Sequence, residues 1–246
     1  MREPSEHDHD LTVELKGVSF GYAREAPILR AVSLRLTSGL VLLLGPNGHG
    51  KSTLLKLLAG VESPDEGRVE IDGRDLWTDE AAARRRMAYV PEQPDITPYA
   101  SVREVLELVA DLRDEPRERV PEVLDLLGLE VGSGLSRRSI RELSKGQRRR
   151  VLLAASRLGD PQVLLLDEPL DALDRGLRAD LLGWLEQRQK AGALIVVVTH
   201  ELEPFVPMAT AAVGMVRGSA RYFAELPECE EERVVLLEKL SRGQEV

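Results

Sequence analysis

The chain has 246 residues, enough for one large hydrophobic core or for a core with a smaller lobe. Its 42 acidic residues outnumber 33 basic ones and give a formal net charge of -9, which argues against a surface devoted to nucleic acid. The longest purely apolar stretches are strand-sized and fall well short of the roughly 20 residues that span a bilayer, so we expect no transmembrane helix.

The start of the sequence predicts a tail and then an antiparallel β layer. Residues 1–10 are charged and lack the apolar core of a secretion signal, so we expect a flexible tail on a cytoplasmic protein. Leu11 to Phe20 and Ile28 to Leu36 alternate apolar and polar residues, as half-buried antiparallel strands do. These strands would open a single domain that covers residues 11–246.

A buried strand and a glycine-rich loop come next. The apolar run Leu40 to Leu44 leads into Gly45-Pro46-Asn47-Gly48-His49-Gly50-Lys51-Ser52-Thr53, and an apolar helix continues to Ala59. A phosphate-binding P-loop needs this order, because its glycines turn successive N–H groups inward at the positive end of the helix. Lys51 would reach the β- and γ-phosphates, and Ser52 would offer its hydroxyl to Mg²⁺. The loop predicts a nucleotide binder and leaves its task open.

Helices replace strands in the middle of the chain. Gly67 to Gly73 and Met87 to Pro91 have the pattern of short strands, the first closed by an Asp-Gly turn and the second by proline. From Ser101 to Gly128, apolar residues recur at helical spacing. We therefore expect a helical subdomain, about 95–142, inserted in the nucleotide-binding core.

Continuous apolar strands alternate with helices in the second half. Val163 to Leu166 and Leu194 to Val198 are apolar throughout, and helices are predicted after Ser144 and over Leu177 to Gln189. This alternation is typical of a parallel sheet buried on both faces. The predicted fold class is α/β: a P-loop NTPase core with a mostly parallel sheet, an N-terminal antiparallel β layer and an inserted helical lobe. A hairpin over residues 212–223 and a charged helix over 230–240 come last.

Two carboxylates stand where a metal nucleotide would sit. Asp167 and Glu168 follow the strand that ends at Leu166, at the sheet edge where ligands of open α/β sheets bind. Asp167 would hold Mg²⁺ through water, and Glu168 could accept a proton from the water that attacks the γ-phosphate. His200 ends the next strand and should point at the same edge, as a γ-phosphate contact. Glu168 and His200 are the candidate catalytic residues.

Leu143-Ser144-Lys145-Gly146-Gln147 resembles the signature motif of ATP-binding cassette (ABC) ATPases, with Lys145 in place of the usual second glycine. The other family motifs have counterparts in the right order. The glycine loop resembles Walker A, although His49 stands where a small residue is common, and Leu164 to Glu168 resembles Walker B. Asp171 to Asp174 resembles the D-loop, and His200 the switch histidine. In Phe20-Gly21-Tyr22, which resembles the aromatic loop, Tyr22 would stack on adenine.

The loop Tyr89 to Gln93 resembles the family's glutamine loop, which links Mg²⁺ to the helical lobe. Glu92 stands at the place of the glutamine, and Gln93 follows one step later. We expect Gln93 to bind nucleotide and metal, with Glu92 as the alternative. This region looks more like exporter-type cassettes. The run Arg148-Arg149-Arg150 is typical of a solvated helix face or of internal ion pairs.

The resemblance implies an ATPase that powers substrate translocation. Two subunits would join head to tail with two ATP molecules, and one subunit would touch the ATP of the other through Ser144, Lys145, Gly146, Gln147 and Asp174. Separately encoded permease subunits would hold the protein on the inner face of the cell membrane. The alternative is a soluble ABC-type ATPase in DNA repair, translation or cluster assembly. Several of those proteins need long coiled-coil insertions, zinc cysteines or two cassettes, which this sequence lacks.

Overall fold

The computed structural model describes residues 11–23, 26–78, 84–93, 96–129 and 134–244. The predicted tail, residues 1–10, lies outside them. Within the described ranges, no helix is both long enough and apolar enough to cross a bilayer.

The predicted antiparallel layer is present as a four-stranded sheet in the order β2-β1-β4-β5. Its strands are β1 (Thr12–Phe20), β2 (Leu29–Thr37), β4 (Glu66–Ile71) and β5 (Arg74–Asp75). β1 pairs antiparallel with both β2 and β4. Its alternating apolar residues, such as Val13 and Leu15, are buried, as the period of two requires.

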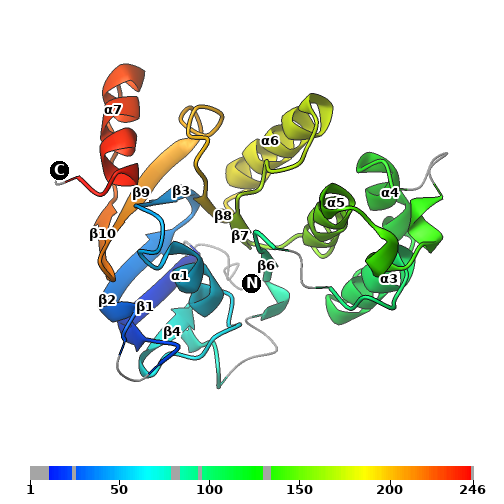
Figure 1. Cartoon of the computed structure of the whole chain (residues 1–246), viewed down its shortest axis with the longest axis horizontal. Coiled ribbons are helices and arrows are strands. Elements are labelled where there is room, and N and C mark those ends of the chain that lie inside the picture. Colours follow the sequence, from blue (N-terminus) through cyan, green and yellow to red (C-terminus); the bar gives the residue numbers. More distant parts are fainter. Residues whose placement is uncertain (1–10, 24–25, 79–83, 94–95, 130–133, 245–246) are drawn as a thin grey trace, which may run out of the picture.

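A six-stranded sheet forms the centre of the molecule, in the order β10-β9-β3-β8-β7-β6 (Figure 1). Its strands are β3 (Gly39–Leu44), β6 (Met87–Val90), β7 (Val163–Asp167), β8 (Leu194–Val198), β9 (Ala209–Val216) and β10 (Ser219–Phe223). All neighbours pair in parallel except β9 and β10, which form the predicted hairpin. The carboxyl ends of β3, β7 and β8 therefore meet at one edge.

Alternate residues of the central strands belong to two different cores. Val41 of β3 and Leu165 of β7 pack with α1 (Lys51–Leu58) and with the antiparallel sheet. Leu42 and Leu166 point to the other face and pack with the remaining helices. A parallel strand covered on both faces has to be apolar at every position, which explains the continuous runs in the sequence.

The other helices are α3 (Val102–Leu112), α4 (Arg119–Leu126), α5 (Lys145–Ser156), α6 (Arg175–Lys190) and α7 (Glu230–Ser241), with 3-10 turns at Leu135–Arg137 and Ile140–Glu142. Of these helices, α6 and α7 lie near the sheet, whereas α3 and α4 lie to one side of the molecule, beyond α5 (Figure 1). We call α3, α4 and the two 3-10 turns the helical lobe. α5 contacts α3 and α4 on one side and β6 on the other, so it joins the lobe to the sheet.

Candidate active site

A cleft of about 580 Å³ lies at the sheet edge where β3, β7 and β8 end. The loop before α1 supplies one wall, and the residues after β7 and β8 supply the other. The lining residues are Ile28, Asn47, Gly48, Gly50, Lys51, Ser52, Thr53, Glu92, Asp167, Glu168, Asp171, Val198, His200 and Glu201. The structure therefore brings the predicted P-loop, the two predicted carboxylates and the predicted histidine together.

The glycine loop has the backbone that only glycine accommodates easily. Gly45 has a φ of 148°, and a Cβ on this residue would lie 2.4 Å from the carbonyl oxygen of Met215. Gly50 has a φ of 96° and precedes the first turn of α1, whose N–H groups lack helical partners. The positive end of α1 thus faces the cleft, which favours an anion there.

Lys51 is held by its own loop. Its Nζ donates to the carbonyl oxygens of Gly45 (2.6 Å) and Pro46 (3.0 Å). Burial lowers the pKa of Lys51, while the negative charges of Glu168 and Asp167 raise it. The ammonium group therefore sits beside both carboxylates and supplies a positive charge within the cleft.

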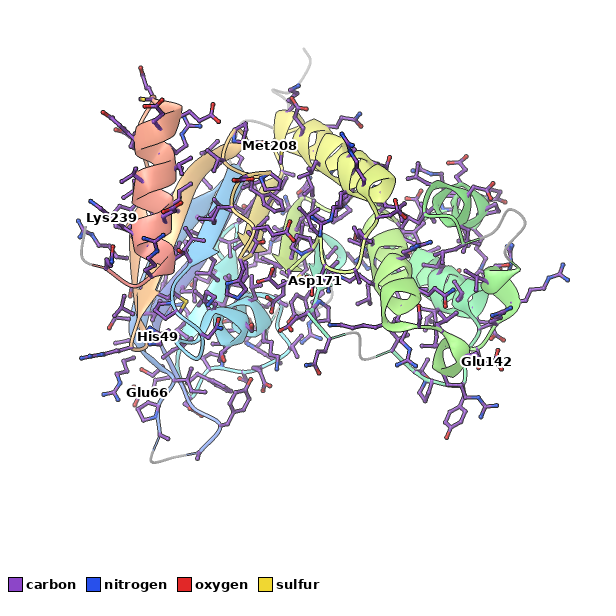
Figure 2. All side chains as sticks on the ribbon, turned by 45° about the horizontal axis from the view of Figure 1, so that its top comes forward. His49, Glu66, Glu142, Asp171, Met208 and Lys239 are labelled. Atoms are coloured by element: carbon purple, nitrogen blue, oxygen red, sulfur yellow. The ribbon has the colours of Figure 1, made fainter. Side chains whose placement is uncertain are left out.

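The glycine loop borders a second cavity as well. Pro46 and His49 do not line the cleft; they line a cavity of about 690 Å³ together with Arg217 and Arg242. His49 Nδ1 accepts the backbone N–H of Arg217 at 3.4 Å. In Figure 2, His49 lies on the α7 side of the sheet, whereas Asp171 lies toward α5. Pro46 has no N–H to offer a phosphate. Its carbonyl oxygen accepts a hydrogen bond from Lys51 and so helps to position that side chain.

Asp167 is a buried carboxylate, 3% exposed. Burial raises its pKa, and a hydrogen bond from the Ser52 side chain opposes that rise. Within the described residues no cluster of three His, Cys, Asp or Glu side chains forms a metal site from protein ligands alone. Mg²⁺ commonly takes one or two protein oxygens, with phosphate oxygens and water completing its shell. The carboxylate of Asp167 and the hydroxyl of Ser52 fit that ion.

Glu168 is presented to the cleft by an unusual backbone conformation. Its φ is 49°, in the left-handed region, and its N–H donates to the carbonyl of Val198 at 2.8 Å. Its Oε2 accepts the backbone N–H of His200 at 3.3 Å, and His200 Nε2 lies 3.5 Å from Oε1. Burial raises the pKa of Glu168. A carboxylate with a raised pKa accepts protons more readily, as a general base must.

The loop after β6 places Glu92, not Gln93, in the cleft. Glu92 lies close enough to Asp167 for its charge to raise the pKa of that residue. Gln93 is exposed and absent from the lining. The lining therefore favours Glu92, the alternative, over Gln93 for this loop.

Other predicted residues lie outside the cleft of their own chain. Tyr22 is exposed, packs edge-on against Phe20 at 5.0 Å between centroids, and approaches α1 through Lys56. Ser144 begins α5 with a capping box: its Oγ accepts the N–H of Gln147 at 3.2 Å, and Gln147 Oε1 accepts the N–H of Ser144 at 2.9 Å. The remaining residues predicted to act on a partner's ATP, Lys145, Gly146 and Asp174, are likewise not in the lining.

The predicted site residues did not include two carboxylates of the cleft lining or the buried arginine of α5. Asp171 and Glu201 line the cleft, and Asp171 could have been suspected from its place three residues after Glu168. Arg149 was expected on a solvated face or in an ion pair, but it is 2% exposed and donates to backbone carbonyls. The available signal was helical spacing, because Arg149 lies four residues before the buried Leu153.

Comparisons with known proteins agree with this architecture. The ABC transporter family profile matches residues 29–171. The sulfate/thiosulfate import ATP-binding protein CysA of Synechococcus elongatus is 42% identical over 187 residues, which cover 74% of this chain and 53% of the relative. The CysA protein of Thermosynechococcus vestitus is 38% identical over 211 residues, covering 85% and 62%. The chain thus spans between about half and three fifths of these curated relatives.

Solved structures give the same result. The ATP-binding subunit of an ABC transporter superposes with a TM-score of 0.77 at 27% identity, covering 86% of this chain and 89% of that one. A dimeric bacterial ABC transporter cassette superposes with a TM-score of 0.75 at 27% identity, covering 86% and 98%. The family profile, these relatives and the order of motifs around the cleft lead to one conclusion: the chain belongs to the ABC transporter family.

Proposed function

We propose that the chain binds ATP with Mg²⁺ and hydrolyses it to ADP and phosphate. The observation that carries this proposal is the cleft itself, in which Lys51 and Ser52 of the P-loop lie with Asp167, Glu168 and His200. Each group has a distinct task. The N–H groups of the loop and Lys51 bind phosphate oxygens, and Asp167 and Ser52 hold Mg²⁺, which neutralises charge that develops on the phosphates.

Glu168 is the general base in this proposal. Its carboxylate accepts a proton from the attacking water while the backbone N–H of His200 keeps it oriented. The His200 side chain, 63% exposed, is free to turn toward the γ-phosphate. Glu92, which lies near Asp167 in the cleft lining, would help to bind Mg²⁺. Asn47, Gly48, Gly50 and Thr53 shape the phosphate site, and Tyr22 stacks on adenine beyond it.

We infer that two subunits complete each other's sites head to tail. Ser144, Lys145, Gly146, Gln147 and Asp174 would contact the ATP bound to the partner. Two observations support this: none of them lines the cleft of its own chain, and the N-terminus of α5 is an anion-binding feature. The solved cassettes that superpose on this chain include a dimer bound to ADP and phosphate.

We further propose that ATP hydrolysis drives transport through separately encoded permease subunits. The curated relatives are named as import ATP-binding proteins, which supports a transport role without fixing this chain's substrate or direction. The helical subdomain, about 95–142, would dock the permease at the inner face of the membrane. Its α3 carries two exposed apolar side chains one turn apart, Leu108 (57%) and Leu112 (63%).

Binding of ATP and of its analogues by the purified chain tests the P-loop assignment at the core of this proposal. Lys51→Ala should nearly abolish binding of ATP, because Lys51 carries the one ammonium group among the described residues that line the cleft. Wild type and Lys51→Ala that bind ATP analogues equally well would overturn the P-loop assignment.

The transport role needs a test of its own. Leu108→Asp with Leu112→Asp should leave hydrolysis by the isolated subunit intact and abolish co-purification with the membrane partner. Val235→Asp on α7, an exposed apolar residue away from the lobe, is the matched control. Salt-sensitive binding of DNA or RNA through the lobe would instead favour a soluble ABC-type machine.

A further inference from the structure

Arg149 of α5 is the most deeply buried arginine side chain among the described residues. Its guanidinium donates to the backbone carbonyls of Pro91, Asp167 and Glu168, and it reaches the carbonyl of Glu92 at 3.3 Å. These carbonyls belong to two segments far apart in the sequence, the loop after β6 and the end of β7. One side chain on a third segment therefore holds both.

The segments that Arg149 holds carry the chemistry of the cleft. Pro91 and Glu92 form the loop that places a carboxylate in the lining, and Asp167 and Glu168 are two more of the carboxylates there. The carbonyl of Glu168 also accepts the N–H of Asp171 at 3.1 Å. With a φ of 49°, Glu168 adopts a backbone that residues with side chains seldom use. Such a conformation persists only where surrounding contacts hold it.

The charge of Arg149 suits this position. Burial lowers the pKa of Arg149, and the negative charges of Asp171, Asp167, Glu168 and Glu92 oppose that fall, so the acidic groups of the cleft favour its buried positive charge. A guanidinium presents five N–H donors in a planar fork. A lysine offers a single ammonium point on a flexible stem, and glutamine is too short to serve both segments.

A second arginine does the same structural task away from the cleft. Arg113, at the end of α3, donates to the carbonyls of Ala155 (2.9 Å), Leu158 (2.6 Å) and Met87 (3.1 Å). It too ties the lobe to α5 and to β6. None of its partners lines the cleft. A substitution of Arg113 is therefore a control that loses similar packing contacts without disturbing the site.

We propose that Arg149 is a positioning residue for hydrolysis: it fixes Glu168 and the Glu92 loop relative to α5, so that turnover depends on it and nucleotide binding does not. The inference rests on the proposed ATPase activity. Nucleotide binding depends on the P-loop, which Arg149 does not touch. A base displaced by about 1 Å can cost on the order of 100-fold in rate.

The kinetic test compares Arg149→Gln, Arg149→Lys and Arg113→Gln with wild type in the full chain. We expect Arg149→Gln to lower kcat about 100-fold while the Kd for a non-hydrolysable ATP analogue stays at the wild-type value. Arg149→Lys should recover part of kcat. Arg113→Gln should lower the unfolding temperature and leave kcat unchanged at temperatures where it is folded. Wild-type kcat in Arg149→Gln, or an equal loss of kcat in Arg113→Gln, would overturn the proposal.

Hydrogen exchange supplies a readout that does not depend on turnover. Removing the guanidinium should speed exchange of the N–H groups of Glu168 and Asp171, the two amides whose partners involve the Glu168 backbone. Arg113→Gln should leave both amides protected. If wild type proves unable to hydrolyse ATP, the proposed function fails, yet faster exchange in Arg149→Gln still supports the positioning role. Unchanged exchange at both amides in Arg149→Gln and Arg149→Lys refutes it.

Discussion

Glu168→Gln separates ATP binding from ATP hydrolysis more cleanly than any other single change. Glutamine has the shape of glutamate, and its amide oxygen can still accept the N–H of His200, which lies 3.3 Å from Oε2. The metal and phosphate contacts assigned to Asp167, Ser52 and Lys51 are untouched. Proton acceptance is lost, because a neutral amide is a very weak base, and the negative charge beside Lys51 and Arg149 is lost with it.

The size of the effect follows from the loss of proton acceptance. Proton transfer by a positioned side chain contributes about 10²- to 10⁴-fold, or about 3 to 5 kcal/mol of barrier. We therefore expect kcat to fall by at least about 100-fold with no loss of ATP affinity. If hydrolysis reopens the proposed head-to-tail pair, Glu168→Gln should also accumulate a dimer at saturating ATP, visible by light scattering. Adding Ser144→Ala to the Glu168→Gln protein should separate the dimer into monomers that still bind ATP.

The same substitution has a stability consequence with a definite sign. The pKa of Glu168 in the folded protein lies above its ordinary value of 4.5 because the carboxyl is buried. Between those two values the folded chain binds more protons than the unfolded chain, so this group's contribution to stability falls as the pH rises above 4.5. At pH 7 the amide removes that cost, and Glu168→Gln should unfold at the same temperature as wild type or higher. Wild-type ATP turnover by this variant would refute the assignment of the base.

Three further predictions test the rest of the site. Tyr22→Ala should weaken ATP and GTP alike by about 1 kcal/mol, the value of ring stacking, in analogue titrations; a loss as severe as that of a P-loop variant would contradict a purely stacking role. Glu92→Ala should lower kcat at limiting Mg²⁺ and Gln93→Ala should not; the reverse result would restore Gln93 to the metal. Gly45→Ala should lower the free energy of unfolding by about 1 to 3 kcal/mol, measured by denaturant titration, because its Cβ would meet the Met215 carbonyl at 2.4 Å; unchanged stability would refute the need for glycine.

The fold was predictable because its elements have strong and distinct patterns. The apolar runs at Leu40 to Leu44 and Val163 to Leu166 became central parallel strands, and the alternating N-terminal runs became the antiparallel sheet. The P-loop and the carboxylates at the end of β7 follow from the same logic, since parallel strands end at one edge. The sequence order therefore predicted the wall of the cleft as well as the fold.

What could not be predicted depends on backbone geometry within loops and on distant partners. Neither periodicity nor propensity states whether Glu92 or Gln93 faces the cleft, because an irregular loop has no fixed side-chain period. Nor does the run Arg148 to Arg150 reveal which arginine is buried. Arg148 donates to the carbonyls of Ile140 and Arg141 within the lobe, whereas Arg149 reaches carbonyls 18 and 19 residues further along.

α5 carries contacts of two kinds, and their positions on the helix connect them. Ser144 and Arg149 are five residues apart, so they point about 140° apart around the axis. Ser144 caps the end proposed to meet the partner's ATP, while Arg149 points inward to the carbonyl of Glu168. A helix moves as a rigid body over this distance. Contact between subunits at Ser144 would therefore move Arg149 and, through it, the backbone of Glu168. The rate of hydrolysis would then depend on dimer closure through this one helix.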